Sequence, residues 1–74
     1  MRKITVREKQ VIELLSEGLT AKEIAYNLEL SIHTIRAYVK SIISKLGARN
    51  IAHAVALVQK NKSSDIEIIN PKTD

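Results

Sequence analysis

Apolar residues recur at helical spacing in four successive stretches of the chain, and each stretch begins at a residue that caps helices. Thr5 opens the first and Thr20 the second, each followed three positions later by glutamate, which is the capping-box pattern. Ser31 opens the third stretch and Asn50 the fourth. A glycine follows the first and third stretches, where helices commonly stop. The pattern predicts four helices, the last ending near Lys60.

The third stretch has one clean apolar stripe, made of Ile35, Val39, Ile42 and Leu46. The short second helix is expected to end near Leu28 or Glu29, which leaves a turn of three to four residues before Ser31. Leu30 is apolar and would anchor this turn to the core. A short helix, a tight turn and a longer helix are typical of a helix-turn-helix motif, although any small three- or four-helix bundle also has short loops.

Length and composition agree with one all-α domain over residues 1–62, followed by a flexible C-terminal tail over 63–74. The chain has 74 residues, only 3% of them aromatic, and no cysteine. A β-sandwich needs more aromatic and turn residues, and a disulfide or cysteine-bound metal is excluded. Three isoleucines at 66, 68 and 69 leave room for a short extended piece or a docked segment in the tail.

Charge is distributed unevenly along the chain. Residues 31–62 carry a net charge of +6 without one acid, whereas 1–30 are neutral and 63–74 carry −2. A 32-residue stretch without a carboxylate is a candidate surface for binding a polyanion. Charge alone leaves a solvated basic face equally open. In the third helix, the side opposite the apolar stripe carries His33, Arg36, Ala37, Lys40 and Ser44.

Several motifs together resemble a known family. They are Ile4-Thr5-x-Arg7-Glu8 with the following Leu14-Leu15-x-x-Gly18, Lys22-Glu23-Ile24-Ala25 with Leu30-Ser31, Thr34-Ile35-Arg36-x-Tyr38, and Lys45-Leu46-Gly47-Ala48. In this order and at these spacings they resemble the DNA-binding domain of LuxR/GerE-type bacterial transcription regulators, over residues 4 to about 60. The chain departs from the family at Tyr38, where histidine is usual, and at Ile51, where a basic residue is frequent.

The resemblance implies a regulator that reads duplex DNA by placing its third helix in the major groove. We expect base-facing positions at Arg36, Ala37 and Lys40, with His33 at the edge of the groove. The residues expected to face phosphates are Thr20, Lys22, Ser31, Thr34, Tyr38 and Lys45. For Ser31 and Thr34 a local capping role is an equal alternative, and Lys45 has the alternative of capping its own helix.

The fourth helix is apolar on more than one side, which indicates a second partner. One side is expected to pack on the core, while Ala52, Ala56 and Leu57 remain for dimerisation, the use that the family makes of this helix. The alternative is that the tail folds back over it. We therefore expect a homodimer on an inverted repeat, with RNA polymerase or another regulator as a candidate protein partner.

Other classes of function find little support. Two histidines without cysteines do not make a metal site, and no cofactor motif or nucleophile–base pair predicts an enzyme. No signal peptide or membrane span is expected, so the predicted location is the bacterial cytoplasm, at the nucleoid. The start at Met1, close to the first helix, favours a free-standing regulator over a fragment. The competing function is a helix-turn-helix module that has lost DNA binding and pairs with another regulator through its fourth helix.

Overall fold

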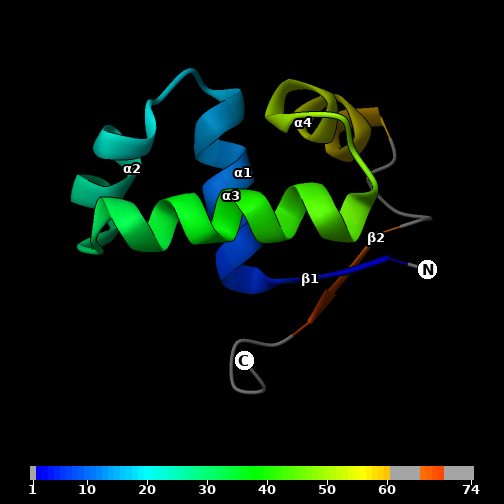
Figure 1. Cartoon of the computed structure of the whole chain (residues 1–74), viewed down its shortest axis with the longest axis horizontal. Helices are drawn as coiled ribbons and strands as arrows, with labels where there is room; N and C mark the ends of the chain where they lie inside the picture. The colour runs from blue at the N-terminus through cyan, green and yellow to red at the C-terminus, as the bar shows by residue number, and fades with distance from the viewer. Residues whose placement is uncertain (1, 61–65, 70–74) are drawn as a thin grey trace.

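A computed structural model describes residues 2–60 and 66–69 of the chain. In chain order its elements are β1 (Arg2–Thr5), α1 (Val6–Ser16), α2 (Ala21–Leu28), α3 (Ile32–Leu46), α4 (Ile51–Lys60) and β2 (Ile66–Ile69). The four predicted helices and the all-α class of the domain are confirmed. Figure 1 shows α3 lying across α1, with α2 towards one end of α3 and α4 towards the other. The longest helix therefore contacts all three others.

The helices begin at the residues that the sequence predicted. Thr5 and Glu8 form a reciprocal capping box at α1, and Thr20 and Glu23 form another at α2. At α4 the Oδ1 of Asn50 accepts from the N–H of His53 at 2.8 Å. These side chains satisfy backbone groups that a helix end would otherwise leave without a partner.

The core is aliphatic. Its buried members come from β1 and all four helices: Ile4, Val11, Ile12, Ile24, Ala25, Ile35, Ile42, Leu46 and Ala54. Three of them lie on the stripe predicted for α3, whose fourth member, Val39, is half-buried. Because α3 supplies the middle of the core, its other side is left to face solvent.

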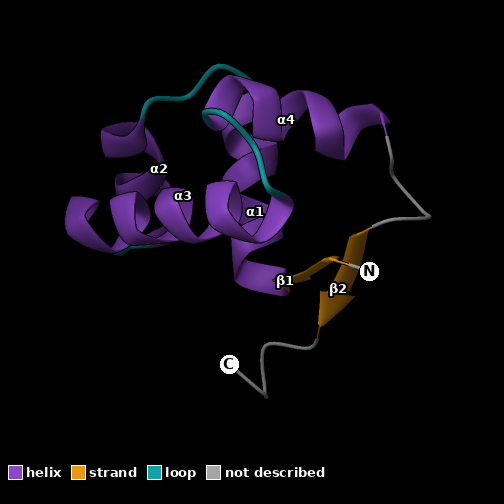
Figure 2. Ribbon diagram, turned by 45° about the vertical axis from the view of Figure 1, so that its right-hand side comes forward, coloured by secondary structure: helices purple, strands orange, loops and turns teal. Residues whose placement is uncertain are grey.

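The strands were not predicted. β2 runs parallel to β1 in the register Arg2↔Ile66 to Thr5↔Ile69, and both views place the two strands side by side (Figure 2). Isoleucine favours extended backbone, but its pairing partner lies more than 60 positions away in the chain. Residues 66–69 thus form the short extended piece that the sequence left open. The flexible tail predicted for the remainder of 63–74 lies outside the described residues.

Candidate nucleic-acid interface

The turn between α2 and α3 is three residues long. Glu29 adopts a left-handed conformation (φ 59°, ψ 44°), and the N–H of Leu30 donates to the carbonyl of Ala25 at 2.9 Å. Leu30 packs against the core, as predicted. Ser31 then caps α3, because its Oγ accepts from the N–H of Thr34 at 3.1 Å. The predicted helix-turn-helix is therefore present, and hydrogen bonds fix both ends of its turn.

The side of α3 that points away from the core is the one predicted to read bases. The four residues concerned are all exposed: His33, Arg36, Ala37 and Lys40. Only groups that solvent reaches can contact the edges of base pairs. The exposure of this face is thus confirmed, whereas the base contacts themselves stay a prediction.

The basic side chains on this face take part in no ion pair among the residues that the structure describes. In the part of the chain that the structure describes, the ion pairs are Lys9–Glu13 and Lys45–Glu8. Arg36 and Lys40 belong to neither of them, and they lie one helical turn apart on the same face of α3. An unneutralised pair of cations on an exposed helix attracts the phosphates of DNA and can donate to guanine.

The hydroxyl groups predicted to face phosphates form hydrogen bonds within the fold. Thr20 Oγ1 accepts from the N–H of Glu23 at 3.2 Å, and Ser31 Oγ lies 2.9 Å from Thr34 Oγ1 as well as capping α3. The local capping role considered for Ser31 is therefore confirmed. Thr20 and Ser31 are exposed and Thr34 is half-buried. Their contacts with phosphates stay a prediction.

The remaining candidates for phosphate contact differ from one another in exposure. Lys22, at the start of α2, is exposed, whereas Tyr38 is half-buried and packs against the core. Lys45 lies in the last turn of α3, and its Nζ is 2.9 Å from Oε1 of Glu8. Among the described residues, Lys22 therefore takes part in no ion pair, whereas Lys45 is engaged in one.

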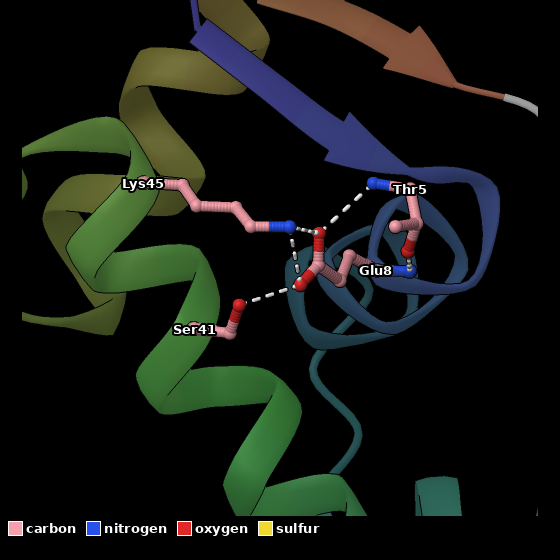
Figure 3. A network of polar contacts seen from close by, with 4 residues as sticks. All are labelled: Thr5, Glu8, Ser41 and Lys45. Atoms are coloured by element: carbon pink, nitrogen blue, oxygen red, sulfur yellow. Dashed lines mark hydrogen bonds and ion pairs between the residues drawn. The ribbon is translucent and has the colours of Figure 1, made fainter. Parts of the chain in front are cut away.

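Figure 3 shows the polar network around that ion pair. The carboxylate of Glu8, whose side chain is only 4% exposed, accepts from Lys45 Nζ, from Ser41 Oγ at 2.7 Å and from the N–H of Thr5 at 2.9 Å. The sequence pattern predicted only a capping box for Glu8 and no role for Ser41. Their positions could have indicated this network, because Ser41 and Lys45 lie four residues apart beside the apolar stripe of α3.

Two opposing effects act on the pKa of Glu8. Burial raises the pKa, but the hydrogen bonds from Ser41, the Thr5 N–H and Lys45, together with the charge of Lys45, lower the pKa by more than burial raises it. The net result is a pKa below the ordinary value for glutamate. Glu8 is therefore ionised at neutral pH although it is buried.

The structure reduces the surface that α4 offers to a partner. Ala54 is buried, and the larger apolar residues Ile51, Val55, Leu57 and Val58 are half-buried against the core. Leu57, expected among the residues left over for dimerisation, is half-buried and packs against the core; its part in a dimer stays a prediction. Ala52 and Ala56 are exposed. The described part of the tail lies against β1 and α1.

Comparison with known proteins agrees with this geometry. Residues 2–58 match the GerE family, described as bacterial regulatory proteins of the luxR family. The chain is 40% identical over 52 residues to the spore germination protein GerE of Bacillus subtilis, a match that covers 70% of each chain. It is 39% identical over 57 residues to the transcriptional regulatory protein YvfU of Bacillus subtilis, covering 77% of this chain. The response regulator RamR of Streptomyces coelicolor is 43% identical over 56 residues.

Two of these relatives, YvfU and RamR, are much longer than the chain. The matches span 28% of YvfU and 28% of RamR, so the chain corresponds to roughly a quarter of such proteins. Within residues 2–60 and 66–69, no helix combines the length and the apolar character that crossing a bilayer requires.

Proposed function

Since the chain belongs to the luxR family of bacterial regulatory proteins, we propose that it binds duplex DNA sequence-specifically and regulates transcription, with α3 in the major groove. One observation carries this proposal: α3 presents Arg36 and Lys40 on an exposed face that lies opposite its buried stripe. An α-helix fits the major groove, where every base pair shows a distinct pattern of donors and acceptors.

The residues of the helix-turn-helix divide into two groups. Arg36, Ala37 and Lys40 face the bases, with His33 at the groove edge, and Arg36 is suited to bidentate contact with guanine. Thr20, Lys22, Ser31, Thr34 and Tyr38 face the phosphates on either side. Support for the second group comes from the N-termini of α2 and α3, whose backbone dipoles favour negative charge nearby.

We further propose that two copies bind together on an inverted repeat. One recognition helix reads few base pairs, so high specific affinity is easier for two domains than for one. Ala52 and Ala56 are exposed on α4 and small enough for two such helices to approach closely. Because Leu57 is already half-buried, the shared surface is small, and we expect dimerisation to be weak without DNA.

The DNA proposal is tested by selecting a preferred duplex from a random pool and measuring affinity at several salt concentrations. The logarithm of the binding constant should fall by about 0.9 per phosphate neutralised for each unit rise in the logarithm of salt. Arg36→Ala should cost roughly 1–3 kcal/mol on the selected duplex and relax its sequence preference. Lys22→Ala should weaken selected and random duplexes alike.

Lys9→Ala is the matched control, because it removes one lysine that α1 already pairs with Glu13. It should leave both affinities near those of the parent. Failure of the parent to bind any duplex at low salt would overturn the proposal and favour the protein-interaction module. Equal behaviour of the Arg36 and Lys22 variants on both duplexes would show that the recognition face is assigned wrongly.

The dimer is tested with Ala56→Glu, which places a charge on an exposed position of α4. The variant should stay folded and bind one half-site normally, but lose cooperative binding to a duplex with two half-sites. Gln10→Glu adds the same charge at an exposed position of α1, outside the proposed interface, and should retain cooperativity. Unchanged cooperativity in the Ala56 variant would contradict the α4 dimer.

A further inference from the structure

The buried carboxylate of Glu8 is joined to α3 at two points. Ser41 Oγ donates to its Oε2 at 2.7 Å, while Lys45 Nζ donates to Oε1 at 2.9 Å and to Oε2 at 3.2 Å. Ser41 and Lys45 are four residues apart and therefore lie one above the other on the same side of the helix. Two bonds one turn apart oppose both rotation of α3 about its axis and sliding along it.

The carboxylate is itself held from the opposite side. The N–H of Thr5 donates to Oε1 at 2.9 Å, and the N–H of Glu8 donates to Oγ1 of Thr5 at 3.0 Å. Ile4, just before the capping box, is fully buried. The bonds to α3 thus start from a carboxylate whose own position is fixed by the start of α1.

Helix geometry places this attachment away from the face proposed to meet DNA. Each residue turns an α-helix by about 100°, so Lys45 lies about 180° from Arg36 and about 140° from Lys40. If Arg36 points into the groove, Lys45 points back towards α1, where Glu8 holds it. Moving Lys45 to a phosphate would leave a buried carboxylate without its ion partner, which is costly.

We propose that Ser41 and Lys45 are positioning residues of the recognition helix, acting through Glu8 and not through contact with DNA. This inference rests on the proposed function of α3. It changes the expectation for Lys45, which the sequence grouped with the phosphate contacts. The three side chains set the direction in which Arg36 and Lys40 leave the domain, and hence how well these residues meet the edges of bases.

A double-mutant cycle in the full chain separates positioning from phosphate contact. The variants are Lys45→Met, Glu8→Gln and the two combined, each measured on the selected duplex and on a random duplex across salt. Lys45→Met should weaken the selected duplex by about 5-fold or more, and should have little further effect once Glu8→Gln is present. Its salt dependence on the random duplex should equal that of the parent.

A phosphate contact at Lys45 gives the opposite results. The salt slope would then decrease by about 0.9 in Lys45→Met, and the weakening would be the same with Glu8 or Gln at position 8. Either result overturns the inference. Lys22→Ala is the positive control for a lost phosphate contact and should show the reduced slope.

Thermal unfolding followed by circular dichroism verifies that each variant is folded at the binding temperature. If Glu8→Gln does not fold, Ser41→Ala is measured instead of the cycle, because that change removes one hydrogen bond to the carboxylate and leaves the ion pair in place. Ser41→Ala should also weaken the selected duplex more than the random one, and equal weakening would contradict the inference. A parent that binds no DNA overturns the proposed function, whereas a parent that binds while Lys45→Met loses salt slope overturns only the positioning role.

Discussion

Glu29 offers a direct test of how the turn of the helix-turn-helix is held. Its φ is 59°, and among the described residues it alone has a positive φ without being glycine. The left-handed conformation costs an L-residue roughly 1–2 kcal/mol, and glycine escapes that cost. Glycine also loses about 0.4–1 kcal/mol more backbone entropy on folding. We therefore expect Glu29→Gly to stabilise the domain by about 0.5–1 kcal/mol, a rise in Tm of about 2–8 °C for a chain of this size.

The side chain of Glu29 lets the backbone effect be isolated. It is exposed, and no hydrogen bond or ion pair of its carboxylate is found among the described residues, so its removal breaks no such contact. Glu29→Ala keeps a Cβ at the same φ and should leave Tm near the parent value, while Glu29→Asn should fall between the two. Gly47→Ala, at φ 62°, should lower Tm by about as much as Glu29→Gly raises it.

The assay is thermal unfolding followed by circular dichroism at 222 nm in one buffer for all four variants. Equal melting temperatures for Glu29→Gly and Glu29→Ala would refute the reasoning, because the strain would then not come from φ. A gain in Glu29→Ala as large as that in Glu29→Gly would assign the effect to the carboxylate instead.

Two further predictions concern Glu8 and the pairing of β2 with β1. Because folding lowers the pKa of Glu8, the unfolded chain binds more protons near pH 4, so the free energy of unfolding should fall as the pH drops from about 4.3 through the lower native pKa. In a urea-unfolding series from pH 7 to 3, Glu8→Gln should lose less stability over this range than the parent. A Glu8→Gln variant that loses as much stability in acid as the parent would contradict the prediction. For β2, successive N–H groups of a strand point to opposite sides, so only one of Glu67→Pro and Ile68→Pro should break the ladder to β1 and cost about 1 kcal/mol in thermal unfolding. Parent-like melting of both proline variants would show that the pairing adds nothing in solution.

Much of the helical framework was predictable because its signals are local. Thr5, Thr20, Ser31 and Asn50 cap the helix that follows each of them, and a capping side chain bonds to backbone only three positions away. The single stripe on α3 fixed which side is buried, and therefore which side is exposed. These inferences required only the period of the helix and the chemistry of its ends.

The turn was predicted in place but not in conformation. The sequence identified three to four residues between α2 and α3, with Leu30 facing the core. It gave no sign that Glu29 adopts a left-handed conformation, because glycine and asparagine are the residues usually found there. The packing of Leu30 on the core and the capping of α3 by Ser31 override the local conformational preference of Glu29.

What the sequence could not supply are contacts between residues distant in the chain. Glu8 has a complete local explanation as the second half of a capping box, so nothing in the pattern asks for Ser41 or Lys45, which lie 33 and 37 positions away. The same limit applies to β2, whose four residues carry no signal for the strand that they meet. For Glu8 the partners are brought close only when α3 packs on α1, since that packing decides which polar groups of the two helices meet. A lysine on the basic helix therefore looks like a DNA contact in the sequence and proves in the structure to be bound to a buried acid. Sign of charge and position on a helix predict the basic face of α3 as a whole, but the packing of α1 on α3 decides which of its lysines is engaged in an ion pair within the fold.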